Sequence, residues 1–165
     1  MYEALSAATL SPTGRRRASG SLRVASALFG LLAPGDPVPA YRLSAGTSLP
    51  GVGSLVAAWR PVLEPELAAH RLVVDLRSGP YAALARVPHA IAVRVLRDTG
   101  GVRTVVSHDN KWTKGLLARA LCEGGARSVA DVAEVARSVA DLVEVDGRRV
   151  DLVLHGLASA RLPCG

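Results

Sequence analysis

The 165-residue chain has few cysteines, lysines and aromatic residues, and it has no long apolar run. Its two cysteines, Cys122 and Cys164, show no paired spacing, which argues against a disulfide scaffold and a cysteine-based zinc site. The four histidines lack HxH and HxxxH spacing, so we predict neither a metal site nor a cofactor. No apolar stretch approaches the ~18–20 residues that span a bilayer. Charge follows the apolar part of the first residues, the reverse of a secretory signal. We therefore expect a cytoplasmic protein with no membrane partner.

Hydrophobic residues make up 49% of the chain. This excludes disorder that is caused by low hydrophobicity. The length suits one domain, since single domains cluster near ~100–150 residues. We expect a single domain over 1–165, in which residues 156–165 form a loose tail.

Positive charge dominates the chain, with 20 basic residues against 14 acidic ones and a net charge of +6. The excess is uneven, because residues 1–127 hold 16 basic and 8 acidic residues, whereas residues 128–165 hold 4 and 6. A basic body with an acidic end suits a polyanionic partner such as nucleic acid. Ordinary solubility charge is the alternative explanation.

Hydrophobic periodicity predicts a mixture of helices and strands. The predicted helices cover residues 15–32, 54–59, 78–84, 110–122 and 128–140. The predicted strands cover residues 71–76, 90–97, 102–107, 142–145 and 150–154, with hairpin turns at 98–101 and at Asp146-Gly147. We expect loops over 1–14 and 34–53, and a further turn or two over 65–70. A near-perfect duplication, ARSVADVAEV followed by ARSVADLVEV, spans 126–145. Its ten-residue period is close to three helical turns, so both copies could share one face.

The string Leu49-Pro50-Gly51-Val52-Gly53 matches the hairpin of helix-hairpin-helix DNA-binding motifs. Gly51 and Gly53 would expose backbone N–H groups at the start of a helix capped by Ser54, and such groups hold a phosphate without reading the base. The segment before the hairpin, from Arg42 to Ser48, is short and interrupted by glycine, which makes it a poor first helix. The alternative is a tight turn that leads into a capped helix.

Both lysines of the chain lie at the start of the helix predicted over 110–122. Lys111 and Lys114 share a face of this helix, and Arg119 lies close to it. Cations at a helix N-terminus oppose the helix dipole, so a bound anion would offset their cost. A solvated basic face is the alternative. Nearby, Ser107, His108 and Asp109 cannot form a catalytic triad, because neighbours along a strand point to opposite faces.

Three segments, in the right order, resemble the YaaA-type peroxide stress protein family. SALFGLLAPGDPVPAYRLSAG (26–46) is similar to that family's SGLYGxLRPxDxxxxYRLxMG segment, LVVDLRSGPYAAL (72–84) to its strand and L-x-S-x-x-Y turn, and VVSHDNKWTKGLLAR (105–119) to its strand and basic helix. The chain departs from the family pattern at Ala33, Ser44 and Lys114, where the family usually has Arg, Glu and Arg. By this resemblance, about the first third of the usual family length is absent.

The resemblance implies an α+β fold, in which helices surround a mixed central β-sheet. It also implies a bacterial protein without a secure enzymatic activity. Such a protein would bind DNA through a basic cleft and limit intracellular free iron and the oxidative DNA damage that iron causes. Under this hypothesis the phosphate-binding residues are Arg42, Gly51, Gly53, Lys111, Lys114 and Arg119, while Arg15 to Arg17 add non-specific charge.

Two alternatives stay open from the sequence. The first is a remnant of an enzyme that acts on a phosphorylated small molecule, with Asp75, Ser78, Tyr81 or His108 serving the chemistry. The second is a non-functional fragment, in which the strand from Leu72 to Leu76 would lack a partner and expose an edge.

Overall fold

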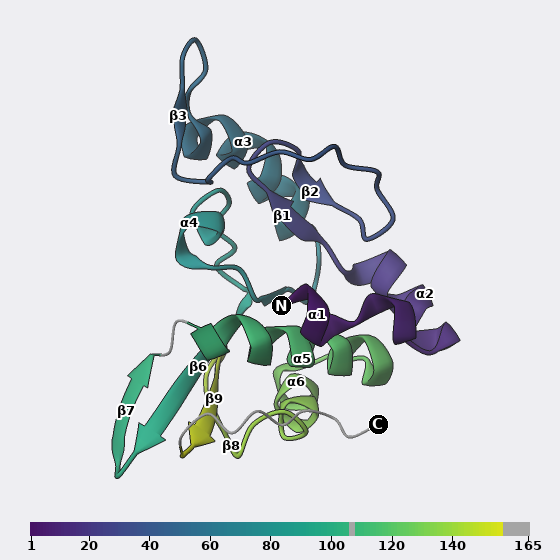
Figure 1. Ribbon diagram of the computed structural model, residues 1–165, viewed down its shortest axis with the longest axis vertical. Helices are drawn as coiled ribbons and strands as arrows, with labels where there is room; N and C mark the ends of the chain where they lie inside the picture. The colour runs from purple at the N-terminus through teal and green to yellow at the C-terminus, as the bar shows by residue number, and fades with distance from the viewer. Residues whose placement is uncertain (106–107, 157–165) are drawn as a thin grey trace.

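The computed structural model describes residues 1–105 and 108–156. Figure 1 shows a mixed β-sheet with two helices, α5 and α6, on one side of it, and a second region of small hairpins around helix α3. Helix α5 lies between the sheet and the N-terminal segment (Figure 1). This combination of helices with a mixed sheet confirms the expected α+β fold.

The main sheet has the strand order β5-β6-β9-β8, with β7 also paired to β6. Its strands are β5 (Val74–Asp75), β6 (Ile91–Thr99), β7 (Val102–Val105), β8 (Leu142–Asp146) and β9 (Arg149–His155). Strands β5, β6 and β9 run parallel, while β7 and β8 are antiparallel to their neighbours. Both predicted hairpins form. The first turns at Gly100-Gly101, and the second turns at Gly147-Arg148, one residue later than predicted.

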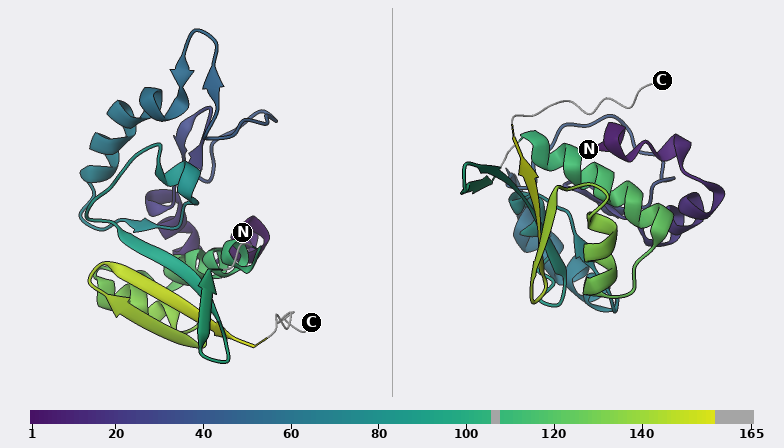
Figure 2. Two further views of the ribbon diagram at one scale, coloured as in Figure 1. Left: turned by 90° about the vertical axis from the view of Figure 1, so that its left-hand side faces the viewer. Right: turned by 90° about the horizontal axis from the view of Figure 1, so that it is seen from below.

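The core of this region lies between the sheet and the helices α5 (His108–Gly124) and α6 (Val129–Ala136), which cover the same face (Figure 2). Leu117 of α5 and Val132 of α6 are fully buried against residues of β6 and β9. Gly125 ends α5 with a φ of +75°, and Ser128 caps α6 by accepting the Asp131 N–H at 3.1 Å. These two signals delimit the helices close to their predicted bounds.

The predicted loop over 1–14 is wrong, because this segment is largely helical. It contains α1 (Tyr2–Leu5), a 3-10 turn η1 (Ala7–Thr9) and the start of α2 (Pro12–Ser21). The Ser11 hydroxyl accepts the Gly14 N–H at 2.9 Å, and Pro12 occupies the first helical position. The pair Ser-Pro therefore begins a helix here instead of marking a turn.

The helix predicted over 15–32 is also wrong in its second half. Helix α2 ends at Ser21, and a hairpin of β1 (Val24–Ser26) and β2 (Gly30–Leu32) follows. The Ser26 hydroxyl accepts the Phe29 N–H at 2.8 Å, which favours a turn over a helix. Gly30 has a φ of +76°, and a Cβ there would lie 2.8 Å from the ring of Trp59. The turn thus depends on a glycine packed under an indole ring.

Helix α3 (Leu55–Ala68) continues past the proline expected to stop it at Trp59. Pro61 and Pro65 lie four residues apart on the exposed face, where the carbonyls that they leave unbonded can meet water. The opposite face buries Leu55, Leu63 and Leu67 in a second core, formed with residues near the hairpins and with Leu84. The short elements β3 (Ser48–Leu49), β4 (Gly53–Ser54) and α4 (Gly79–Ala82) complete this region.

The duplicated ten-residue segment does not form two helical copies. The first copy (126–135) forms most of α6, whereas the second (136–145) contains the end of α6, a turn and most of β8, so the helix predicted to reach residue 140 ends at Ala136. The expected loose tail, 156–165, lies outside the described residues except for Gly156. Within the described part of the chain, no helix has the combined length and apolarity needed to cross a membrane.

Candidate nucleic-acid interface

The predicted phosphate hairpin is a small exposed loop directly before α3. Strands β3 and β4 pair antiparallel with Leu49 opposite Gly53, and the Val52 N–H donates to the Leu49 carbonyl at 3.1 Å. Gly51 and Gly53 have φ values of +75° and +80°, a left-handed conformation that favours glycine. No described atom lies within 4 Å of the position that a Cβ would take at either residue. The backbone of this turn is therefore open to a large ligand.

The hairpin is attached firmly to the start of α3. The N–H of the buried Leu55 donates to the Thr47 carbonyl at 3.2 Å. The Ser54 side chain makes no capping hydrogen bond, so it leaves the first-turn N–H groups of α3 to other acceptors. Residues 34–47 contain no helix. The structure thus has a hairpin that leads directly into a helix, without the preceding helix that a helix-hairpin-helix motif requires.

Arg42 lies in the irregular segment that leads to this hairpin. Its side chain is exposed, and no described carboxylate lies within ion-pair distance of it. The preceding residue, Tyr41, is held in place by two contacts. Its hydroxyl lies 2.6 Å from the Ser26 hydroxyl, and its ring packs edge-to-face on Phe29 with the ring centroids 5.6 Å apart. The backbone at Arg42 is therefore fixed while its guanidinium reaches solvent.

The three predicted cations of α5 do not share one exposed surface. Lys111 is exposed, but only 8% of the surface of Lys114 is accessible. The N-terminal segment packs so closely across α5 that a Cβ at Gly115 would lie 2.3 Å from the Met1 carbonyl oxygen. Helical spacing predicted the two lysines on one face, but it could not show that other parts of the chain bury one of them.

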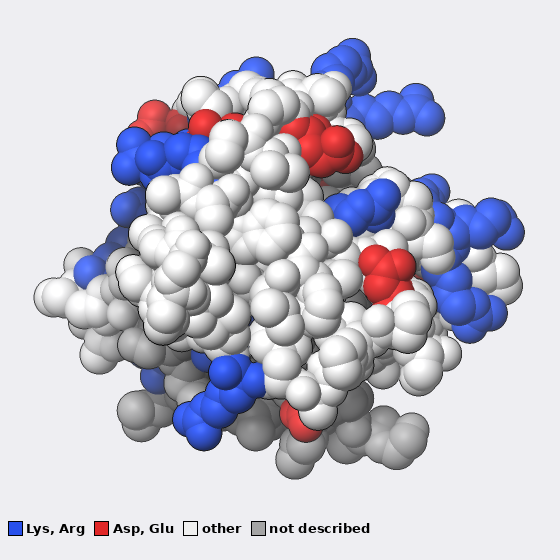
Figure 3. Space-filling view, turned by 90° about the horizontal axis from the view of Figure 1, so that it is seen from above, with Lys and Arg blue, Asp and Glu red and all other residues white. Residues whose placement is uncertain are grey.

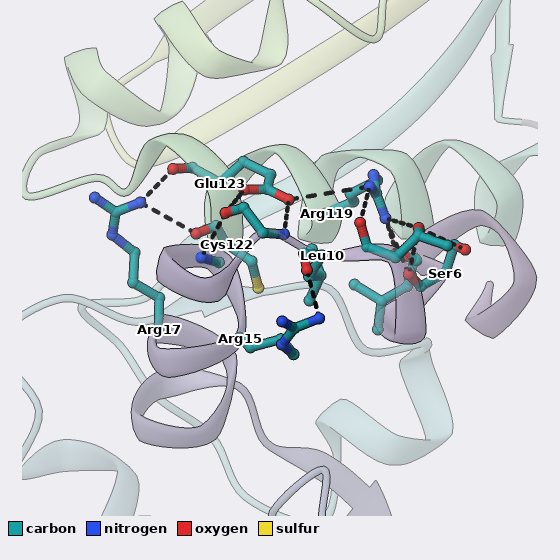
Figure 4. Close-up of polar contacts among 11 residues, drawn as sticks. Ser6, Leu10, Arg15, Arg17, Arg119, Cys122 and Glu123 are labelled. Atoms are coloured by element: carbon teal, nitrogen blue, oxygen red, sulfur yellow. Dashed lines mark hydrogen bonds and ion pairs between the residues drawn. The ribbon is translucent and has the colours of Figure 1, made fainter.

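Arg119 binds the N-terminal segment of its own chain (Figure 4). Its guanidinium donates to the carbonyls of Leu5, Ser6 and Thr9, each at 3.0 Å. One turn later, Glu123 accepts the Ser11 N–H at 2.9 Å and also bonds the Ser11 hydroxyl. These hydrogen bonds from Ser11 lower the pKa of the Glu123 carboxyl. Arg119 and Glu123 therefore tie the first eleven residues to α5.

A charged cluster that the sequence analysis did not assign to binding lies where β5 ends. The Arg77 guanidinium donates to both Asp75 carboxylate oxygens, at 2.9 and 2.8 Å, and to the Ala85 carbonyl at 2.8 Å. Burial alone would raise the pKa of Asp75, but the hydrogen bonds and charge of Arg77 outweigh it and hold that pKa below its ordinary value. The Lys114 ammonium lies beside this pair, 3.5 Å from the Arg77 carbonyl. The signal for this pair was the Asp-x-Arg spacing at a strand end, since residues two apart share a face.

The exposed cations without a carboxylate partner concentrate in the basic part of the chain. Among the exposed cations of the described residues, those with no described carboxylate within 4.0 Å are Arg15, Arg16, Arg23, Arg42, Arg71, Arg86, Lys111, Arg127 and Arg148. All but the last belong to residues 1–127. On the face seen from above, basic side chains border the molecule and acidic ones are fewer (Figure 3).

Two hollows in the described surface lie away from the predicted cations. One, of about 580 Å³, is lined by residues of α3 together with Arg86 and Pro88. The other, of about 230 Å³, is lined mainly by apolar residues around Leu5 and Leu22. Among the described residues, no group of three or more His, Cys, Asp or Glu side chains could hold a metal ion. Neither hollow contains Lys111, Lys114 or Arg119.

The comparison with known proteins agrees with the motifs. The family model described as peroxide stress protein YaaA matches residues 1–140. The chain belongs to this family. A UPF0246 protein of Corynebacterium efficiens is 44% identical over 144 residues, which cover 82% of this chain and 57% of that protein. A UPF0246 protein of Streptomyces coelicolor is 45% identical over 133 residues, covering 76% of this chain and 50% of that protein. The chain thus spans little more than half the length of these relatives.

Proposed function

We propose that this YaaA-family chain binds the sugar–phosphate backbone of DNA and acts in the response to peroxide. The observation that carries the proposal is the glycine hairpin at α3, whose turn has no described atom around its Cβ positions, in a chain whose exposed cations mostly have no described carboxylate partner. Backbone N–H groups and arginines bind phosphate oxygens without reading the base. The expected ligand is therefore duplex DNA of any sequence.

Within this proposal, the predicted contacts separate into two groups. Arg42, Lys111 and the Gly51–Gly53 turn are exposed and would contact phosphates directly, and Arg15 and Arg16 would add long-range attraction. Arg119 would contribute indirectly, because its guanidinium is bound to carbonyls of the N-terminal segment. Lys114 lies below the surface, where a DNA backbone would not reach it.

The first test is a fluorescence-anisotropy titration of a labelled duplex over a range of NaCl concentrations. Each phosphate neutralised by a cation contributes about −0.9 to the slope of log K against log [NaCl]. Arg42→Ala should weaken binding and reduce that slope by about one. Arg137→Ala removes an arginine that is exposed on α6 and paired with Glu134, and it should leave the slope unchanged. A flat response to salt for the unmodified chain would refute backbone binding.

The second test concerns the hairpin itself. Gly53→Ala forces a side chain onto a residue with a φ of +80°, which should distort the turn and weaken binding to every duplex. Gly46→Ala is the matched control, because Gly46 is exposed, has no positive φ and has no described neighbour within 4 Å of its Cβ position. Equal affinity of the two variants would remove the hairpin from the binding surface.

The alternative of an enzyme acting on a phosphorylated small molecule requires a cleft lined by the predicted cations. The two hollows described above are lined by other residues, so neither of them supports this alternative. Limiting free iron is a separate prediction of the family resemblance. No set of metal ligands among the described side chains supports it. Measuring iron bound to the purified chain after dialysis against ferrous iron would test it directly.

A further inference from the structure

The carboxyl end of β5 lies along an edge of β6 that strands pair only in part. Strand β9 covers the other edge of β6 over residues 92–98, so β5 and β7 must share this one. The register pairs β5 with residues 91–92 and β7 with residues 96–99. Among the described residues, no strand pairs with 93–95 on this edge. In open sheets, ligands commonly bind outside the carboxyl ends of parallel strands.

Among the described residues, the charged groups near the end of β5 do not balance. The Asp75 carboxylate accepts two hydrogen bonds from the Arg77 guanidinium and one from the Arg77 N–H, and the charge of Arg77 neutralises it. Lys114 adds a second cation, and among the described groups its three donors have one long hydrogen bond, at 3.5 Å, and no carboxylate within 4.0 Å. One carboxylate therefore faces two cations in a site where Lys114 is more than nine-tenths buried.

A buried cation with few partners is costly, and a bound anion would reduce that cost. Burial lowers the pKa of the Lys114 ammonium, and the Asp75 charge offsets only part of that effect. Long side chains on a helix lean toward its N-terminus, so Lys114 also brings its charge toward the positive end of the α5 dipole. An anion bound here would meet positive potential from the lysine and from the helix.

We propose that Lys114 and the carboxyl end of β5 form a binding site for a phosphate monoester. A monoester carries more negative charge than a backbone diester. It also has substituents on one side only, so it can enter a mostly buried site through which a continuous strand could not pass. The phosphate would come from the end of a DNA strand or from a small molecule. Only the DNA source rests on the proposed function.

The site is tested by thermal unfolding with inorganic phosphate against NaCl at equal ionic strength. Phosphate should raise the Tm of the unmodified chain to a plateau. Lys114→Met keeps the unbranched shape but removes the charge, so it should weaken phosphate affinity by about 10- to 100-fold. Without phosphate, its Tm should equal or exceed that of the unmodified chain, because a buried charge is gone. Arg137→Gln makes the same charge change on an exposed residue and should keep the phosphate response.

Two results would overturn this site. One is an unmodified chain whose Tm phosphate does not move, an outcome that does not depend on whether any variant folds. The other is a Lys114→Met or Lys114→Gln chain that responds to phosphate as strongly as the unmodified one.

Oligonucleotides identify the source of the phosphate. A DNA duplex with a recessed 5′ end that carries a phosphate should bind more tightly than the same duplex with a 5′-hydroxyl. Lys114→Met should abolish this difference in affinity. Equal binding of the two duplexes, together with a phosphate-dependent Tm, supports the site with a small molecule as its ligand. The salt slope measured with the 5′-hydroxyl duplex reports on the proposed function alone, so the two ideas can fail independently.

Discussion

Replacing Arg119 by alanine separates a structural arginine from a DNA-binding one. Its guanidinium donates four hydrogen bonds to the N-terminal segment, at 2.9–3.0 Å, with Leu5, Ser6 and Thr9 as acceptors. A typical hydrogen bond contributes about 0.5–1.5 kcal/mol net, and several of these acceptors can turn to water once they are released. We therefore expect Arg119→Ala to lower the free energy of unfolding by about 2 kcal/mol.

The assay is urea unfolding followed by circular dichroism, together with limited proteolysis. In the variant, cleavage within residues 1–11 should become faster, because the hydrogen bonds of Arg119 are lost and only the packing on α5 and the bonds from Ser11 to Glu123 then hold this segment. The control is Arg137→Ala, whose arginine is 59% exposed and paired with an exposed Glu134, so its loss should cost less than about 1 kcal/mol.

Two results would refute the reasoning on Arg119. The first is a stability loss no larger than that of Arg137→Ala, with unchanged proteolysis. The second is a salt slope of DNA binding reduced by about one in a chain that keeps its stability, which would show that Arg119 contacts phosphate after all.

Three further predictions concern stability. Asp75→Asn should make the free energy of unfolding fall less steeply in acid. The folded-state pKa of Asp75 is depressed, so its contribution to stability is present above the unfolded pKa of about 3.9 and is lost as pH falls through the folded pKa. Urea midpoints from about pH 6 to pH 2 measure this difference. Leu152→Ala should cost about 2–5 kcal/mol in urea unfolding, because Leu152 is fully buried between the sheet and its helices. Pro61→Ala should stabilise the chain by about 1–2 kcal/mol, measured as a higher Tm, since it restores a donor inside α3 on the exposed face.

Local signals in the sequence located most elements of the main sheet and its helices. The period-two pattern of β6 and the glycines at its turn act within a few residues, and the cap at Ser128 does so too. The helix predicted through residue 32 failed for a different reason. Its second half is apolar enough for a helix, but the Ser26 turn and the contact of Gly30 with Trp59 depend on a residue far along the chain.

The candidate site was predictable only where its features are local in the sequence. The Gly51–Gly53 turn is a local feature, and the structure places it where the sequence did. The fate of the α5 cations is not local, because it depends on how residues 1–11 pack. Gly115 permits that packing, but in the sequence it indicates only a residue of low helix propensity within a helix.

The duplicated decapeptide shows how little separates two folds of nearly the same string. The copies differ at two positions, where Val132 and Ala133 of the first are replaced by Leu142 and Val143 in the second. Ala133 packs inside α6, whereas Val143 pairs with Leu152 in the sheet. Alanine favours helices and β-branched valine favours strands, so Ala133 favours a helix in the first copy and Val143 favours a strand in the second. During folding, β9 could pair with the first copy, ten residues earlier, instead of the second, because the two copies are almost the same. The valine at residue 143 is the main difference that favours the correct hairpin.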